Sequence, residues 1–174
     1  MLELRVHSLV ETHVVAGALA GLSRGGDLIV LSGDMGAGKT AFAQGFGVAL
    51  GVTEPITSPT FTLVHSYDLP SAVRGAEVLH HADLYRLERT TEVTDLALEE
   101  LADGDGIVLV EWGDVVETLF GDHLDVHLEV DFDDGDTVDD DLMSTVRRIE
   151  ISAVGPSWAA RWSRVVEACE AFAC

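Results

Sequence analysis

A glycine-rich loop carries the most specific chemistry in this sequence. Gly33 to Thr40 fits the pattern G-x-x-x-x-G-K-[ST] at every fixed position. Glycines let such a backbone curl until successive N–H groups point at phosphate oxygens, and the helix that follows presents its positive N-terminal end to the same anion. In loops of this kind the lysine, here Lys39, bridges the β and γ phosphates, and the hydroxyl, here of Thr40, binds Mg²⁺. The pattern therefore predicts nucleotide binding by Gly33, Asp34, Met35, Gly36, Ala37, Gly38, Lys39, Thr40 and Ala41.

The lysine of this loop is unusual within the chain, because Lys39 is the only lysine among 174 residues. A bias against lysine that left this position untouched favours a functional role over a chance match to the motif. The same count argues against a GTPase switch, since guanine recognition by an Asn-Lys-x-Asp motif needs a second lysine. We therefore expect ATP to be preferred over GTP.

Two acidic residues end apolar segments that we expect to be strands. Ile107–Val110 runs directly into Glu111, and the carboxyl end of a buried strand is where open α/β sheets bind ligands. A carboxylate there can hold Mg²⁺ or orient an attacking water. Asp83, at the end of another expected strand, is the rival for either task, unless it only forms a surface ion pair with Arg86. Arg86 is itself a candidate for stabilising charge on the transferring phosphoryl group.

The Thr57–Thr60 segment has two alternative interpretations. A hydroxyl within Thr57–Thr60 could sense the γ-phosphate as switch loops do, or the segment could be an ordinary proline turn. His81 is expected to be a structural or hydrogen-bonding histidine rather than a base.

The order of apolar segments predicts one α/β domain over residues 1–174. The glycine-rich loop joins an apolar strand at Asp27–Ser32 to a helix at Lys39–Leu50, which Gly51 ends. Strands that alternate with helices around two fully apolar runs predict a three-layer sandwich with a mostly parallel central sheet, like that of P-loop NTPases. The other expected strands are 2–6, 61–67, 77–83, 107–110, 124–130 and 146–152, and the other helices are 8–22, about 90–101, 114–120 and one starting at 156.

The sequence also predicts which sides of two helices face the core and how two of the strands are connected. Ser8 opens the first helix with a capping-box pattern. Its expected inner residues are Val10, Val14, Val15, Ala18, Leu19 and Leu22. Those of the closing helix are Trp158, Trp162, Val165 and Val166. A loop that contains Pro70 and Gly75 is expected between the strands at 61–67 and 77–83.

The composition excludes several classes of protein. With 31 acidic and 10 basic residues the net charge is -21, so this surface should repel nucleic acid, and we expect a partner to hold any RNA. High-salt adaptation or a solubility bias are alternative explanations of the acidity. Two cysteines, Cys169 and Cys174, are too few for a disulfide framework or a zinc site and indicate free thiols. No apolar stretch has the length of a membrane helix and the N-terminus lacks a secretory signal, so we expect a cytoplasmic protein.

Several segments in matching order make the chain resemble the TsaE (YjeE) family of bacterial ATPases. Besides Gly33–Thr40 and the first helix, they are Thr57–Thr62 (Thr-Ser-Pro-Thr-Phe-Thr), His81–Leu87 and Glu111-Trp112. The resemblance implies an ATP- and Mg²⁺-binding ATPase that joins the TsaB and TsaD proteins in making threonylcarbamoyladenosine next to the tRNA anticodon. It implies that ATP turnover resets this complex rather than performing the carbamoyl transfer, and that tRNA is contacted only through the complex.

The resemblance also implies a role for each matching residue. Thr40 and Glu111 are the implied Mg²⁺ ligands, Lys39, Glu111 and Asp83 the catalytic residues, and ATP or ADP the bound nucleotide. Thr12 would lie near the adenine, and Asp83 near the phosphates or the catalytic water.

Some positions depart from the family pattern. Asp114 stands where the family often has glutamate, and the acidic stretch 131–141 looks like an insertion that we expect to be a mobile loop. As a Ca²⁺ loop this stretch fails, since its glycine comes one position early and Leu142 occupies position twelve. Because of the insertion, either Arg147 or Arg148 is a candidate for a contact with the nucleotide.

A small-molecule or nucleotide kinase on the same scaffold is the alternative interpretation. The loop and the acidic strand end fit both functions. Such kinases usually carry several basic residues in a mobile lid, and here only Arg86 and Arg89 could serve.

Overall fold

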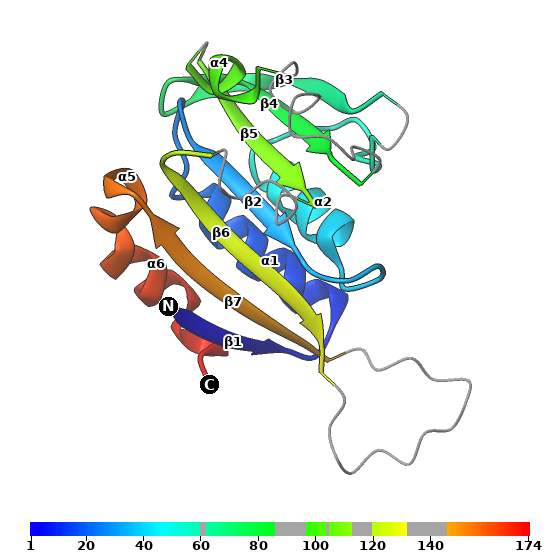
Figure 1. Ribbon diagram of the computed structural model, residues 1–174, viewed down its shortest axis with the longest axis vertical. Helices are drawn as coiled ribbons and strands as arrows, with labels where there is room; N and C mark the ends of the chain where they lie inside the picture. The colour runs from blue at the N-terminus through cyan, green and yellow to red at the C-terminus, as the bar shows by residue number, and fades with distance from the viewer. Residues whose placement is uncertain (60–61, 86–96, 104, 113–119, 132–145) are drawn as a thin grey trace.

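The described part of the computed structural model, residues 1–59, 62–85, 97–103, 105–112, 120–131 and 146–174, is organised around a seven-stranded sheet. The strands are β1 (Leu2–Val6), β2 (Leu28–Ser32), β3 (Val64–Val73), β4 (Ala76–Asp83), β5 (Gly106–Glu111), β6 (His123–Val130) and β7 (Arg147–Val154). Their order is β1-β7-β6-β2-β5-β4-β3, and the central strands β6, β2, β5 and β4 are parallel to one another (Figure 1). Antiparallel pairing adds β7 and β1 at one edge and β3 at the other.

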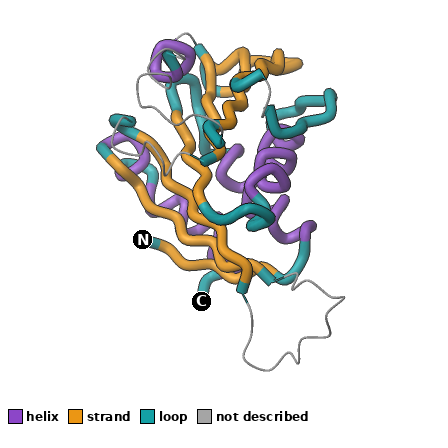
Figure 2. The backbone as a smooth tube through the Cα atoms, turned by 45° about the vertical axis from the view of Figure 1, so that its right-hand side comes forward, coloured by secondary structure: helices purple, strands orange, loops and turns teal. Residues whose placement is uncertain are grey.

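Helices cover both faces of this sheet. Helices α1 (Leu9–Ala20), α2 (Lys39–Ala49), α5 (Pro156–Ala159) and α6 (Trp162–Cys169) lie on one face with the 3₁₀ turn η2 (Glu170–Phe172), and α4 (Leu98–Asp103) lies on the other (Figures 1 and 2). Strand β2 has an apolar sequence because both of its faces are buried. Ile29 and Leu31 pack into the larger core, and Leu28 and Val30 pack into the smaller core beside α4. The predicted three-layer α/β sandwich with a parallel sheet centre is confirmed.

The inner side of α1 differs from the prediction. Ser8 caps the helix as expected, its hydroxyl accepting a hydrogen bond from the Glu11 N–H. Val15 and Leu19 are buried, but Val10 and Val14 are 70% and 52% exposed, so their expected place in the core was wrong. Apolar residues occur nearly all round this helix, and periodicity therefore could not decide which side faces the sheet.

Two other segments also differ from their expected form. Strand β3 continues through Pro70 with a register shift, and the expected loop shrinks to a turn at Arg74 and Gly75, both with positive φ. A proline is tolerated there because β3 is an edge strand. The closing helix is two helices with a break at Arg161, and Val166 is 37% exposed rather than buried.

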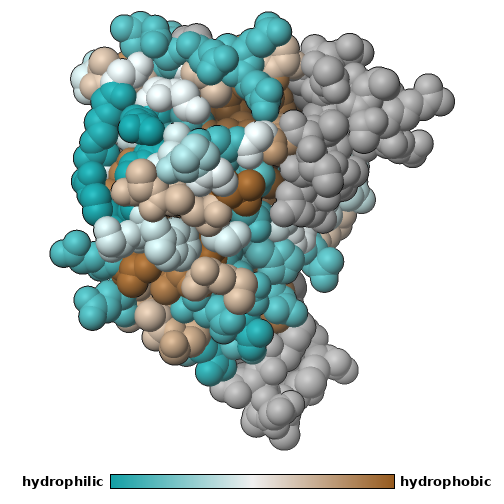
Figure 3. All heavy atoms as spheres, turned by 60° about the vertical axis from the view of Figure 1, so that its left-hand side comes forward, coloured by the Kyte–Doolittle hydropathy of each residue, from teal (hydrophilic) through white to brown (hydrophobic). Residues whose placement is uncertain are grey.

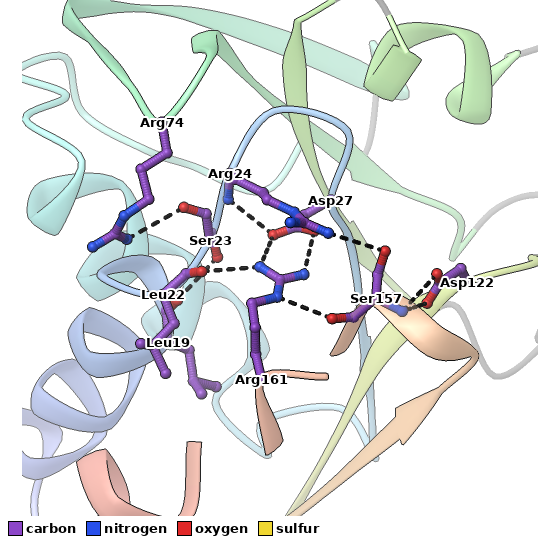
Figure 4. Close-up of polar contacts among 9 residues, drawn as sticks. All are labelled: Leu19, Leu22, Ser23, Arg24, Asp27, Arg74, Asp122, Ser157 and Arg161. Carbon is purple, nitrogen blue, oxygen red and sulfur yellow. Dashed lines mark hydrogen bonds and ion pairs between the residues drawn. The ribbon is translucent and has the colours of Figure 1, made fainter. Parts of the chain in front are cut away.

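A buried ion pair lies at that break. Arg161 turns inward and donates from Nη1 and Nη2 to the two carboxylate oxygens of Asp27, at 2.7 and 2.6 Å (Figure 4). The same guanidinium donates to the carbonyl oxygens of Leu22 and Ser157, so its hydrogen-bonding capacity is well used. Asp27 precedes β2, at the end of that strand remote from the glycine-rich loop. This pair, called the clasp below, therefore fixes the C-terminal helices to the entry of the central strand.

The surface carries both polar and apolar side chains. Hydrophilic residues predominate around smaller hydrophobic patches on the face drawn in Figure 3. Among the described residues, we find no helix with the length and apolarity that a bilayer crossing requires. Both cysteines are free thiols: Cys174 is exposed, whereas burial raises the pKa of Cys169 to about 11. Arg86, Arg89, Asp114, and most of the segments 90–101, 114–120 and 131–141 lie outside the described residues.

Candidate nucleotide-binding site

The glycine-rich loop connects the carboxyl end of β2 to the first turn of α2. Gly33 has a φ of 123°, and a Cβ at this position would collide with the carbonyl oxygen of Leu128 on β6. Gly38, with a φ of 113°, precedes α2 in a left-handed conformation. These positions therefore require glycine, and they bring the N–H groups of the helix start to the edge of the sheet, where an anion would bind.

A pocket of about 380 Å³ opens at this edge. It brings together Lys39, Asp83 and Glu111, three residues that the sequence singled out on separate segments. Asp83 and Glu111 face each other in register on the parallel strands β4 and β5, which explains why they meet. The other lining residues are Met35, Gly36, Gly38, Thr40, Ala41, Ser58, Tyr85 and Trp112.

Lys39 is held inside the loop. Its side chain is almost fully buried, and Nζ donates to the carbonyl oxygens of Gly33 and Asp34 at 2.5 and 2.8 Å. The ammonium group also lies 3.6 Å from the centre of the Trp112 ring. A cation held between backbone carbonyls and an aromatic face is positioned to exchange these partners for phosphate oxygens.

Thr40, Glu111 and His81 form a hydrogen-bonded chain across three elements. The Thr40 hydroxyl donates to Glu111 Oε2 at 3.0 Å, and His81 Nε2 lies 2.9 Å from Glu111 Oε1. Because a carboxylate only accepts, the His81 proton is assigned to Nε2. The buried Nδ1 of His81 has no partner within the described residues. His81 thus orients Glu111 from behind and does not line the pocket.

Asp83 is held by a residue of the Thr57–Thr60 segment, which the sequence predicted to be either a γ-phosphate sensor or an ordinary proline turn. Ser58, in the loop after α2, donates its hydroxyl to Asp83 Oδ2. The other carboxylate oxygen accepts the backbone N–H of Tyr85 at 2.9 Å. The Thr57–Thr60 loop therefore reaches the pocket through Ser58, and it orients an acid that faces the glycine-rich loop. Thr60 lies outside the described residues.

Trp112 was recognised in the sequence only as part of the Glu-Trp segment. Its φ of 63° is unusual for a residue other than glycine, and its N–H donates to the Leu31 carbonyl at 2.9 Å. This backbone turns the indole back over Lys39 and against Tyr85, whose ring centre is 4.8 Å away. The only signal in the sequence was an aromatic residue directly after the acid at a strand end.

Arg147, at the start of β7, contacts the outer side of the loop. Its Nε donates to the Ala37 carbonyl at 2.9 Å, and Nη2 lies 3.5 Å from the Gly36 carbonyl. The C=O and N–H of a trans peptide point in opposite directions, so a carbonyl of Ala37 held outward turns the Gly38 N–H inward. Arg147 therefore supports the shape of the loop, whereas Arg148 is exposed and forms no hydrogen bond with the loop within the described part of the chain.

Thr12 is not among the residues that line this pocket. It is buried in α1, where its hydroxyl donates to the Ser8 carbonyl of the same helix at 3.2 Å. Its implied place beside an adenine stays a prediction.

Two oxygen atoms of the pocket suit a Mg²⁺ ion. Thr40 Oγ1 and Glu111 Oε2 are 3.0 Å apart, so both oxygens could bind one small cation once the hydroxyl hydrogen turns away from the carboxylate. The described residues hold no group of three or more His, Cys, Asp or Glu that could bind a metal alone. Mg²⁺ keeps several waters in proteins and is usually bound by one or two carboxylates together with substrate phosphates.

Known proteins resemble this chain in both sequence and fold. A family model described as threonylcarbamoyl adenosine biosynthesis protein TsaE matches residues 6–138. The tRNA threonylcarbamoyladenosine biosynthesis protein TsaE of Bacillus subtilis is 42% identical over 107 residues, which are 62% of this chain and 63% of that protein. Its counterpart in Streptomyces coelicolor is 41% identical over 143 residues, which are 81% of this chain and 89% of that protein.

A solved structure agrees with these matches. The crystal structure of Bacillus subtilis YdiB superposes with a TM-score of 0.71 and 29% sequence identity, and the superposition covers 98% of this chain and 94% of that one. The match to the family model covers more than half of the chain, and the Streptomyces relative is aligned over most of its length. The chain therefore belongs to the TsaE family.

Proposed function

We propose that the protein is a Mg²⁺-dependent ATPase that acts as an accessory subunit in the synthesis of threonylcarbamoyladenosine next to the tRNA anticodon. The names of its relatives, which are tRNA threonylcarbamoyladenosine biosynthesis proteins, support the pathway. The observation that carries the ATPase activity is the single pocket in which Lys39, Thr40 and Glu111 converge on the glycine-rich loop.

The loop would bind the triphosphate of ATP. Inward N–H groups and the Lys39 ammonium supply hydrogen bonds and positive charge, which is otherwise scarce in a chain of net charge -21. Thr40 and Glu111 would hold Mg²⁺. When bound, this ion neutralises charge on the β- and γ-phosphate oxygens.

Asp83 would orient the attacking water. Ser58 and the Tyr85 N–H hold its carboxylate from two sides, so the acid has a defined orientation toward the pocket. Attack on the γ-phosphorus breaks the bond to the bridging oxygen and releases ADP, and the water proton moves toward Asp83 or a phosphate oxygen. Glu111 has one oxygen bonded to His81 and the other to Thr40, which favours it as the metal-holding acid.

The proposed partners are the TsaB and TsaD proteins, in the cytoplasm. A net charge of -21 supports indirect handling of tRNA, because a phosphate backbone attracts basic rather than acidic surfaces. ATP turnover would then reset a complex in which another subunit holds the tRNA.

Variants of the two acids test this assignment by ATP binding and by phosphate release under multiple turnover. Glu111→Gln should still bind ATP but hydrolyse it about 100-fold more slowly, since the amide keeps the shape and loses the charge. Asp83→Asn should also bind ATP and turn over slowly, while Asp68→Asn, at an exposed position on β3, serves as the matched control. Normal turnover by Glu111→Gln would remove Glu111 as the metal-holding acid, and normal turnover by Asp83→Asn would remove Asp83 as the residue that orients the water. Transfer of the phosphoryl group to a metabolite would contradict the ATPase assignment.

A further inference from the structure

Helix α1 turns an aliphatic side to solvent. Val10 and Val14, one helical turn apart, are 70% and 52% exposed. On the opposite side of the same helix, Val15 and Leu19 are fully buried in the core. A helix that is hydrophobic on all sides is normally buried on all sides. At 12 residues α1 is too short to cross a membrane, so its outer side requires another explanation.

Helix α2 extends this aliphatic surface. A Cβ on Gly45 would clash with His13, and one on Gly17 would touch Ala49. These contacts show that the two helices lie side by side and run in the same direction. Val48, directly before Ala49, is 69% exposed. Val10, Val14 and Val48 are defined here as the valine face. Three aliphatic side chains that are each more than half exposed amount to an apolar patch on the order of a few hundred Å², a size that often marks an interaction site.

The charge around the valine face limits what can cover it. Helices α1 and α2 contain one charged residue each, Glu11 and Lys39. The Glu11 carboxylate accepts the N–H of His7, and Lys39 is buried in the glycine-rich loop. Nucleic acid and anionic membranes are bound by exposed lysine and arginine, which these helices lack. On a protein of net charge -21, an uncharged apolar face is instead complementary to an uncharged apolar face of another protein.

A second copy of this chain fits the valine face poorly. A stable interface of standard size covers about 800 Å² on each partner, well above the area of this patch. Self-association would also bring together two chains that each carry a net charge of -21. A small apolar contact is more typical of the centre of an intermittent interface with a different protein.

We propose that the valine face is a docking site for an uncharged, aliphatic surface of the protein partner with which the ATPase works. This inference rests on the proposed function, in which that partner is the TsaB–TsaD pair. Helix α2 begins at Lys39, so the valine face belongs to the same rigid helix pair that leads from the phosphate-binding loop. A partner docked there would contact the element whose first turn faces the nucleotide.

Binding of the purified full-length protein to a purified TsaB–TsaD complex, measured by calorimetry with ATP and Mg²⁺ present, tests the proposal. Val10→Glu and Val14→Glu should each weaken association about tenfold or more, because an unpaired charge would be buried in an apolar contact. Val10→Ser and Val14→Ser should weaken it less, in the same direction. Val166→Glu adds the same charge at an exposed valine of α6 and should bind as the wild type does. Melting temperature and ATP affinity, measured for every variant, should stay at wild-type values.

Several outcomes would overturn the proposal. Wild-type association by both glutamate variants would remove the valine face as the docking site and leave the proposed function standing. Failure of the wild type to bind the TsaB–TsaD complex in any nucleotide state, while it still binds ATP, would remove the proposed partner and this docking site with it. A concentration-dependent dimer that dissociates on Val14→Glu, seen by sedimentation, would show that a second copy occupies the face.

Discussion

Replacing Arg161 by methionine removes the cation of the clasp and leaves the chain length of the side chain nearly unchanged. Among the described residues, the Asp27 carboxylate, 3% exposed, would then keep the backbone N–H of Arg24 at 2.9 Å and the Arg24 Nε at 4.0 Å as its partners. The packing of the guanidinium 4.0 Å from the centre of the Trp158 ring would also be lost. The variant therefore buries a carboxylate that has lost most of its stabilising partners.

The expected loss of stability is large for this change. Removing one partner of a buried ion pair costs about 3–5 kcal/mol, because the remaining charge is left without compensation in a medium of low polarity. For a chain of this size each kcal/mol corresponds to about 2–4 °C in melting temperature, so the fall should be about 6–20 °C. The double variant Asp27→Leu/Arg161→Met should recover most of that loss, since an apolar pair of similar volume can replace a buried ion pair at little cost.

Thermal and urea unfolding followed by tryptophan fluorescence would measure both effects. The affinity for Mg-ATP, measured below the unfolding range, should be unchanged, because Asp27 lies at the end of β2 remote from the glycine-rich loop. The reasoning would be refuted if Arg161→Met unfolded within about 1 kcal/mol of the wild type. It would also be refuted if the losses of the two single variants simply added in the double variant.

Three further predictions concern the loop and the thiols. Gly33→Ala should abolish nucleotide binding in a filter or calorimetric assay, because the added Cβ collides with the backbone of β6; retained wild-type affinity would contradict this. Arg147→Ala should weaken ATP binding about tenfold, because Arg147 donates to the Ala37 carbonyl of the loop. Arg148→Ala should leave ATP binding unchanged, and equal affinities of the two variants would show that the loop keeps its shape without Arg147. A colorimetric thiol reagent at pH 8 should react fast with Cys174 and should react with Cys169 only after unfolding, because burial keeps the Cys169 thiol protonated below its pKa of about 11. Fast reaction of both thiols in the folded protein would refute the burial of Cys169.

Much of the site could be predicted from the sequence because its residues follow local rules. The glycine-rich motif needs a strand before it and a helix after it, and β2 and α2 supply both. Acids at the carboxyl ends of parallel strands meet at one edge of the sheet, which brings Asp83 opposite Glu111. These positions are set by local backbone geometry and strand order, both of which leave a pattern in the sequence.

Other features depend on contacts that leave no local pattern. The Trp112 ring reaches Lys39 only because its own backbone is left-handed, and Arg147 reaches Ala37 across 110 positions of the chain. The core-facing side of α1 could not be identified, because Val10 and Val15 are equally apolar and only the packing against the sheet and α2 separates them. The inward turn of Arg161 depends on Asp27, 134 positions earlier.

The most direct test of the account is a calorimetric titration of the purified protein with ATP and Mg²⁺. The account predicts one binding site per chain, with weaker binding when Mg²⁺ is withheld and no measurable binding by Lys39→Ala at unchanged melting temperature. An absence of affinity for any nucleoside triphosphate in the presence of Mg²⁺, or wild-type affinity in Lys39→Ala, would contradict it.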